Sequence, residues 1–248
     1  MRLAEGIHVV GSGAMGLSHP LDCHIYLIDT GDGLALIDAG AGYGVRDVLA
    51  NVEREGLRPR DIRWLLLTHG HLDHANGAAE LREGLGLQVL ASSLDARLIE
   101  AGTPEELGLA RPPQFRSYPV DFVQRHCPID RRLMHADVVG LGRLSIEVIL
   151  VPGHTPGSVC YLMEIHGRRV AFVGDILFYN GVLGLLNTPL SDLGAYREFL
   201  PRLANRSIDA LLPGHMLFVL SRGQAHIDKA LLALQRSMLP PCVSELMV

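Results

Sequence analysis

Residues 65–74 read Leu-Leu-Leu-Thr-His-Gly-His-Leu-Asp-His, an apolar run followed at once by side chains that can bind a metal. The apolar run predicts a buried strand, and the metal-binding side chains after it are His69, His71, Asp73 and His74. A buried strand cannot satisfy so many polar groups, whereas neutral imidazoles and carboxylates are ligands that zinc and similar divalent metals take. A solvated polar loop is the alternative, but the clustering favours a metal site.

Three later junctions repeat the pattern of an apolar strand, a glycine and a polar side chain. The junctions are Gly153-His154, Gly174-Asp175 and Gly214-His215. A glycine lets the backbone approach a site more closely than any other residue does. The chain therefore offers further ligand candidates, each at the place where a strand gives way to a loop.

Two similar halves are predicted along the chain. In the first half, strands are expected at 7–10, 24–29, 34–38, 62–68 and 88–91, and helices at 44–55 and 74–82. In the second half, strands are expected at 144–151, 159–165, 169–173 and 208–212, and helices at 193–203 and 224–238. This order predicts an α/β fold of four layers, αββα, in which two packed sheets carry helices outside. We expect a single domain over residues 1–248.

Residues from about 92 to 139 fit neither half. This segment contains Pro104, Pro112, Pro113, Pro119 and Pro128, with Phe115, Tyr118 and Phe122 between them. Long irregular segments in compact domains are usually functional, so we predict an inserted lid over the site. A surface excursion without a catalytic part is the alternative.

Together these motifs resemble those of the metallo-β-lactamase-fold hydrolase superfamily, in particular its glyoxalase II-like and lactonase-like branches. The matching pieces are Thr68-His69-Gly70-His71-Leu72-Asp73-His74, Gly153-His154-Thr155-Pro156-Gly157-Ser158, Gly174-Asp175 and Gly214-His215. They occur in the family's order and cover nearly the whole chain apart from the 92–139 segment. The resemblance implies a first metal ion on His69, His71 and His154, a second on Asp73, His74 and His215, and a bridging Asp175.

The resemblance also implies roles for residues around the metal ligands. Asp38 is expected to support the ligand histidines without binding the metal itself, and so to fix their orientation. Tyr179 is expected to hydrogen-bond a substrate carbonyl. Catalytic roles are expected for Asp73 and Asp175. The lactonase-like interpretation predicts a pocket walled by apolar and aromatic residues of the 92–139 segment and by Phe178, Leu183, Leu185 and Leu186. Weaker candidates to line the pocket are His19, His24, His126 and His135.

The expected activity is hydrolysis of a small carboxylic ester, lactone or thioester by a hydroxide that bridges two divalent metal ions. Zinc is the favoured metal, with manganese or iron as alternatives. A mononuclear iron persulfide dioxygenase on the same fold remains open as a second function, and a non-catalytic binding scaffold as a third. The metal content, two zinc-like ions or one iron, separates the first two.

Composition and charge indicate which partners the protein binds and where in the cell we expect it. The net charge is −5, Lys229 is the single lysine among 22 basic residues, and no basic run stands out, which argues against a nucleic acid as the main partner. Glu5, Gly6 and His8 interrupt any apolar stretch of a secretory signal near the start. The sequence contains no stretch of about 18 or more apolar residues, so we expect no membrane-spanning helix. We expect a cytoplasmic enzyme that acts on a small-molecule substrate and binds neither nucleic acid nor membrane. The sequence leaves its oligomeric state open.

Overall fold

The structure, a computed structural model, describes residues 1–107, 109, 118–236 and 238–243. Its strands form two sheets, one of seven strands in the order β1 to β7 and one of five in the order β12-β11-β10-β9-β8. The first sheet contains β1 Arg2–Ala4, β2 Ile7–Gly11, β3 Ile25–Asp29, β4 Leu34–Ile37, β5 Ile62–Leu66, β6 Gln88–Ser92 and β7 Arg131–Leu133. The second contains β8 Val138–Leu141, β9 Leu144–Leu150, β10 Val159–Ile165, β11 Arg168–Gly174 and β12 Ala210–Pro213.

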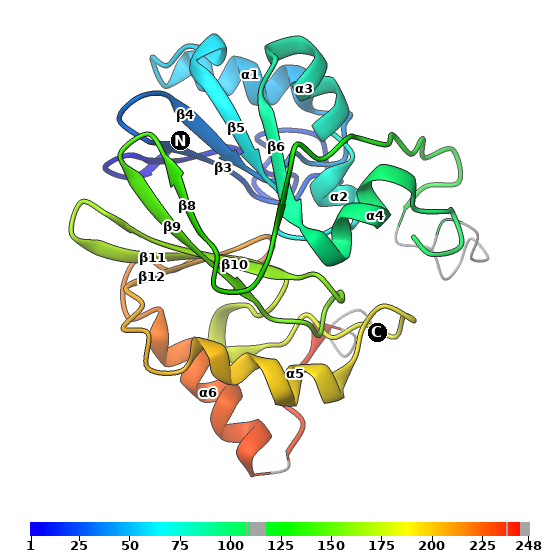
Figure 1. The fold of residues 1–248 in the computed structure, drawn as a ribbon, viewed down its shortest axis with the longest axis vertical. Helices are drawn as coiled ribbons and strands as arrows, with labels where there is room; N and C mark the ends of the chain where they lie inside the picture. Colours follow the sequence, from blue (N-terminus) through cyan, green and yellow to red (C-terminus); the bar gives the residue numbers. More distant parts are fainter. Residues whose placement is uncertain (108, 110–117, 237, 244–248) are drawn as a thin grey trace.

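Helices lie outside the two sheets, so that the sheets face each other in the middle of the molecule (Figure 1). On the side of the first sheet are α1 Val45–Arg54, α2 Leu72–Ala75, α3 Ala78–Leu85 and α4 Ser93–Ala101. On the side of the second sheet are α5 Leu193–Phe199 and α6 Gln224–Gln235. Short 3-10 turns are η1 Pro59–Asp61, η3 Tyr179–Gly181 and η4 Leu200–Leu203.

Separate apolar clusters fill the spaces between these layers. Between the sheets, Tyr26 and Phe172 are buried and their rings meet edge to face at 5.4 Å. Beneath the first sheet's helices, Val48 of α1 belongs to a second cluster, and Ile227 of α6 belongs to a third beneath the other sheet. Burying one such side chain contributes about 1.5–3 kcal/mol. The predicted αββα sandwich is confirmed.

The strand directions bring several loops to one edge of the sandwich. Strands β4 and β5 pair in parallel, as do β11 and β12, so their carboxyl ends lie together within each sheet. Strand β9 runs in the same direction as β11, because both pair antiparallel with β10. The side chains that follow these ends are Asp38, His69, His154, Asp175 and His215.

The helix predicted over 74–82 is two helices, because Asn76 and Gly77 interrupt it. The Asn76 amide donates to the carbonyls of Ala41 and Val123, at 2.9 and 3.0 Å. The backbone of Gly77 passes so close to the Ala39 carbonyl that a Cβ would collide with it. Contacts with distant segments therefore set this break. The helix predicted over 193–203 likewise ends as the 3-10 turn η4, where a proline lacks the donor for an α-helical bond.

The 92–139 segment begins and ends with regular structure that the sequence interpretation missed. Helix α4 opens it, with the Ser92 hydroxyl accepting from the Asp95 amide at 3.1 Å. Strand β7 pairs in parallel with β6 and extends the first sheet, and β8 opens the second sheet. The prediction of irregular structure is wrong for these parts. Pro112, Pro113 and Phe115 lie outside the described residues.

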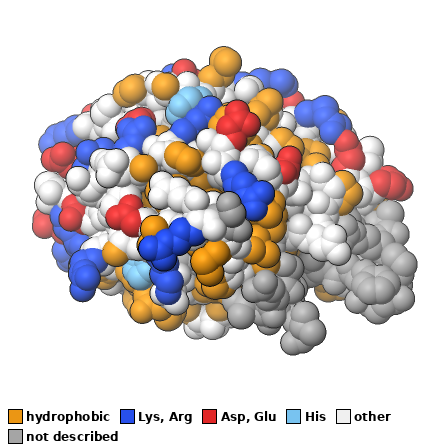
Figure 2. Space-filling model, turned by 90° about the horizontal axis from the view of Figure 1, so that it is seen from below, with side chains coloured by type: hydrophobic (Ala, Val, Ile, Leu, Met, Phe, Trp, Pro, Cys, Tyr) orange, Lys and Arg blue, Asp and Glu red, His pale blue; other side chains and the backbone are white. Residues whose placement is uncertain are grey.

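The face shown in Figure 2 carries acidic and basic side chains interspersed with apolar ones. This is the side of the molecule seen from below in Figure 1. Among the described residues, no helix is both long and apolar enough to cross a membrane.

Candidate metal centre

The imidazoles of His69, His71 and His154 form a triangle of facing nitrogens. His69 Nε2 lies 3.1 Å from His71 Nδ1, and His154 Nε2 lies 3.2 and 2.8 Å from these two atoms. The far nitrogen of His154 faces the Gly184 carbonyl, and that of His69 faces the Thr68 hydroxyl. Since a carbonyl only accepts, Nδ1 of His154 carries its proton and Nε2 presents a lone pair. Converging lone pairs of this kind suit one tetrahedral divalent ion.

Burial keeps this triangle uncharged. It lowers the pKa of His71 to about 3 and holds the pKa values of His69 and His154 below their usual range. Neighbouring imidazoles add to the effect on His69 and His71, because two positive charges would repel at these distances. Near neutral pH the triangle therefore presents neutral imidazoles, which is the form that binds a metal.

A second cluster of Asp73, His74 and His215 lies beside the triangle. Nε2 atoms of His74 and His215 are 3.2 Å apart, and His215 Nε2 lies 3.0 Å from Asp73 Oδ2. The side chain of His215 is 34 % exposed and that of Asp73 20 %, whereas His74 is fully buried. The second cluster therefore opens toward solvent on one side.

Carboxylates give the second cluster a different electrostatic character. Burial opposes the charge on Asp73, but the imidazoles of His74 and His215 lower its pKa and keep it ionised. Burial also opposes a proton on His215, yet Asp175 and Asp73 raise its pKa. The cluster concentrates negative charge around its nitrogens and so attracts a cation.

Asp175 stands between the two groups of side chains. Its Oδ1 lies 3.4 Å from His74 Nε2, and its Oδ2 lies 3.6 Å from His215 Nε2 and 3.7 Å from His154 Nε2. Oδ1 is buried and has no hydrogen-bond partner among the described residues. Leaving a buried carboxylate oxygen unpaired is costly, and a cation shared between the clusters would satisfy it. All the ligands expected from the sequence thus come together, and the donor set fits divalent metal ions.

Asp38 lies where the expected supporting role requires. It follows β4 with a φ of 64°, a conformation that non-glycine residues adopt mainly at strained or functional sites. Its Oδ2 accepts from the Thr68 hydroxyl and from His74 Nδ1, each at 2.8 Å, and its Oδ1 accepts from the Thr68 amide. Asp38 therefore fixes the ring of His74 directly and acts on His69 through Thr68.

Gly174 and Gly214 permit the close approach of the backbone at the cluster. A Cβ on Gly214 would collide with the imidazole of His74 and with Oδ1 of Asp175. At Gly174, whose φ is +48°, a Cβ would collide with the Thr68 hydroxyl. The expectation that glycines allow close packing here is correct at both positions.

Asp95 is a structural tie that the sequence interpretation missed. It is fully buried on α4, and its Oδ2 accepts from the Gly70 amide at 2.9 Å and from the Thr155 hydroxyl at 2.6 Å. Its Oδ1 accepts from the Gly157 amide at 2.7 Å. One carboxylate thus joins the loop of His69 and His71 to the loop of His154. The Ser92-x-x-Asp95 pattern, typical of a helix start, was the available signal.

Other side chains brace the second cluster. His24 bonds through Nε2 to the Met216 carbonyl at 2.8 Å, so it holds the loop that carries His215 instead of lining an open pocket. The Tyr26 hydroxyl donates to the Pro213 carbonyl in the same segment at 2.6 Å. Tyr118 donates its hydroxyl to Asp73 Oδ1, also at 2.6 Å. Aromatic residues of the 92–139 segment were expected at the pocket, but no local sequence pattern pointed to the contact of Tyr118 with Asp73.

Some expected pocket residues lie elsewhere. Tyr179 is 44 % exposed and packs its ring against His226 of α6, with ring centres 4.7 Å apart. This position gives no support to the expected substrate contact. Phe178 and Leu183 are buried to 1 % and 0 % exposure, so the expectation that they wall an open pocket is wrong. After Asp175 the chain turns inward, and Leu183 joins the apolar cluster beneath α6.

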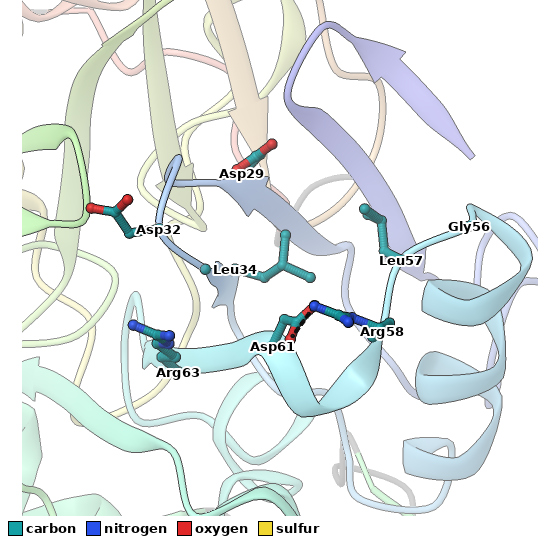
Figure 3. Close-up of a pocket in the computed structure, with 9 residues that line it drawn as sticks. Asp29, Asp32, Leu34, Gly56, Leu57, Arg58, Asp61 and Arg63 are labelled. Carbon is teal, nitrogen blue, oxygen red and sulfur yellow. Dashed lines mark hydrogen bonds and ion pairs between the residues drawn. The ribbon is translucent and has the colours of Figure 1, made fainter.

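A surface hollow of about 360 Å³ lies at the opposite ends of β4 and β5 (Figure 3). Its lining includes Leu34, Arg63 and the ion pair of Arg58 with Asp61, which are 2.6 Å apart. Because β4 and β5 lead from this hollow to the metal cluster, the two places are separated by the length of the strands.

Comparisons with known proteins agree with the fold. The chain is 36 % identical over 160 residues to a hydroxyacylglutathione hydrolase of Anaeromyxobacter dehalogenans, covering 64 % of this chain and 48 % of that protein. It is 29 % identical over 132 residues to hydroxyacylglutathione hydrolase GloC of Haemophilus influenzae, and the match covers 53 % of this chain and 57 % of that protein. The chain thus spans about half the length of these curated relatives.

Solved structures resemble the chain over nearly its whole length. The FEZ-1 metallo-β-lactamase of Legionella gormanii superposes with a TM-score of 0.74 at 21 % identity, covering 96 % of this chain and 94 % of that one. BJP-1, a subclass B3 metallo-β-lactamase of Bradyrhizobium japonicum, gives 0.71 at 24 % identity, covering 96 % and 90 %. At these identities the likeness concerns the fold alone. The family model of the metallo-β-lactamase superfamily matches residues 19–215, most of the chain, and the protein therefore belongs to that superfamily.

Proposed function

We propose that this protein is a metal-dependent hydrolase with two divalent ions, acting on a small acyl thioester, with esters and lactones as related substrates. The observation that carries the proposal is Asp175, whose buried Oδ1 has no hydrogen bond among the described residues and whose carboxylate lies between two groups of metal-binding side chains. A single tetrahedral ion cannot use all of these donors, whereas two ions that share a carboxylate can.

The relatives support the thioester as the first substrate class to test. Both relatives described above are named hydroxyacylglutathione hydrolases, and a hydroxyacylglutathione is a thioester. Thioesters, esters and lactones share an acyl carbonyl, so one arrangement of charges can serve all three. The ions, when bound, would supply an activated water at neutral pH and polarise that carbonyl.

The chain's own side chains would orient these components. His69, His71 and His154 would hold the first ion, and Asp73, His74 and His215 the second, with Asp175 between the ions. Asp38 and Tyr118 fix the orientation of His74 and Asp73, respectively. Asp73 remains ionised, because nearby imidazoles lower its pKa, and it is partly exposed. Because Asp73 lies partly exposed beside the second ion's site, its carboxylate is the proposed carrier of the proton from the attacking water to the leaving thiolate or alkoxide.

Elemental analysis of the purified protein, followed by hydrolysis assays, tests the proposal. We expect about two zinc or manganese ions per chain, and cleavage of a hydroxyacylglutathione that stops on chelation and returns with metal. A simple ester, a lactone and a β-lactam assayed alongside would define the acyl class. One tightly held iron ion, with oxygen uptake on a persulfide and no hydrolysis, would replace this function by persulfide oxidation.

A further inference from the structure

Tyr118 reaches the metal centre from the middle of the 92–139 segment. Its hydroxyl donates to Asp73 Oδ1 at 2.6 Å and lies 3.4 Å from the Asp73 amide, which donates to it. The other oxygen of the same carboxylate, Oδ2, faces His215 Nε2 at 3.0 Å. The two oxygens of Asp73 therefore have separate partners, one in the segment and one in the second cluster.

Contacts other than the Tyr118 hydroxyl also hold residues 118–123 in place. Phe122 is 8 % exposed and packs with Leu72 and Ala41, while its ring meets that of Tyr43 at 5.4 Å. The Val123 amide donates to the Tyr43 hydroxyl at 3.0 Å. Apolar packing and the hydrogen bond from the Val123 amide to the Tyr43 hydroxyl thus dock residues 118–123. The Tyr118 hydroxyl makes a separate contact, with Asp73.

Such a contact controls how a carboxylate can bind a metal. A free carboxylate rotates and can offer one oxygen or both, at a cost in side-chain entropy when an ion fixes it. With Oδ1 engaged by a hydroxyl, only Oδ2 faces His74 and His215. Outer partners of this kind raise metal affinity by fixing the ligand's orientation before the ion arrives.

We infer that Tyr118 is a positioning residue for the second metal ion, through which residues 118–123 complete that ion's site. The inference rests on the proposed two-ion function. It assigns residues 118–123 a defined task in metal binding. The first ion's triangle has no such dependence, because its histidines lie on loops tied by Asp95.

Zinc titration of the dialysed full chain, in competition with a chromophoric chelator, tests the inference in wild type, Tyr118→Phe and Tyr43→Phe. We expect two binding steps in the wild type, and in Tyr118→Phe a second step about 10-fold to 100-fold weaker with the first unchanged. Tyr43→Phe removes the hydroxyl that accepts from the Val123 amide and touches no ligand, and it leaves the packing of Phe122 against Leu72 and Ala41, so both of its steps should stay close to those of the wild type. Cobalt absorption spectra should show the same selective change.

The outcomes separate this inference from the proposed function. Equal constants for wild type and Tyr118→Phe would overturn the positioning role. Equal weakening of both steps, with a lower unfolding temperature of the metal-free variant, would assign Tyr118 to packing and also overturn it. A wild type that binds a single ion would overturn the two-ion function itself, and the inference with it.

Discussion

The two groups of side chains at the candidate metal centre are built in different ways. The triangle of His69, His71 and His154 consists of neutral imidazoles on strand-end loops, and His69 and His154 are each 2 % exposed. The second group contains a carboxylate and opens to solvent at His215, which is 34 % exposed. One site lies inside the junction of the two halves, and the other is completed at the surface.

The supports of the two groups differ as much as the ligands do. A single buried side chain, Asp95, ties both loops of the triangle to α4. The second group depends on separate partners, namely Asp38 for His74, His24 for the loop of His215, and Tyr118 for Asp73. We therefore expect a first ion that is held tightly and a second that exchanges more readily.

The largest effect is expected from Asp175→Ala, which removes the one side chain common to both groups. Turnover of a thioester should fall by about a thousandfold or more, since the residues of one catalytic unit fail together. Metal analysis should show weaker binding of both ions, and circular dichroism an intact fold. If the variant loses only one ion, Asp175 belongs to a single site, and the two groups of ligands do not share a side chain.

Asp95→Ala should damage the triangle and the fold together. Three buried donors, on Gly70, Thr155 and Gly157, would lose their acceptor, so urea unfolding should show a loss of about 3 kcal/mol or more. Affinity for the first ion should fall while the second step persists. Ser92→Ala in the same helix is the matched control, because it removes only a cap worth about 1 kcal/mol. If Ser92→Ala lowered the affinity for the first ion as much as Asp95→Ala does, a specific role of Asp95 would be refuted.

Chelation should remove the two ions at different rates. The ion of the solvent-exposed group should leave first, and the buried triangle should release its ion slowly. An ion present at 100 times its Kd stabilises the fold by about 2.7 kcal/mol, so each loss should lower the unfolding temperature in a separate step. Stopped-flow mixing with a coloured chelator measures the phases. A single phase for both ions would contradict the proposed difference between the sites.

The smallest effect is expected from Tyr179→Phe. The Tyr179 ring packs against His226 on α6 and is 44 % exposed, so its hydroxyl should matter to neither group of ligands. The kcat/KM of the variant should stay within about twofold of the wild type, as for most exposed substitutions. A larger loss in kcat/KM, with unchanged metal content, would restore Tyr179 as a substrate contact.

The local motifs predicted the fold and the grouping of the ligands because both depend on strand ends. Each apolar strand that ends in glycine and a polar side chain delivers that side chain to one edge, as Asp175 and His215 illustrate. Tyr118 and the break at Asn76 were not predictable in this way, since both depend on contacts between segments far apart in the chain. Asp95 lies between these cases, since its helix start was visible locally but its partners were not.

The bonds of Tyr26 to the Pro213 carbonyl, of His24 to the Met216 carbonyl and of Asp95 to the amides of Gly70 and Gly157 share one property. Each holds a ligand loop by its main chain, and a main-chain carbonyl, or an amide N–H except at proline, is present whatever side chain a position carries. Exposed loop positions such as Leu217, at 65 % exposure, can therefore change identity without moving the metal-binding atoms. The ligand side chains would keep their places while the exposed side chains around them vary.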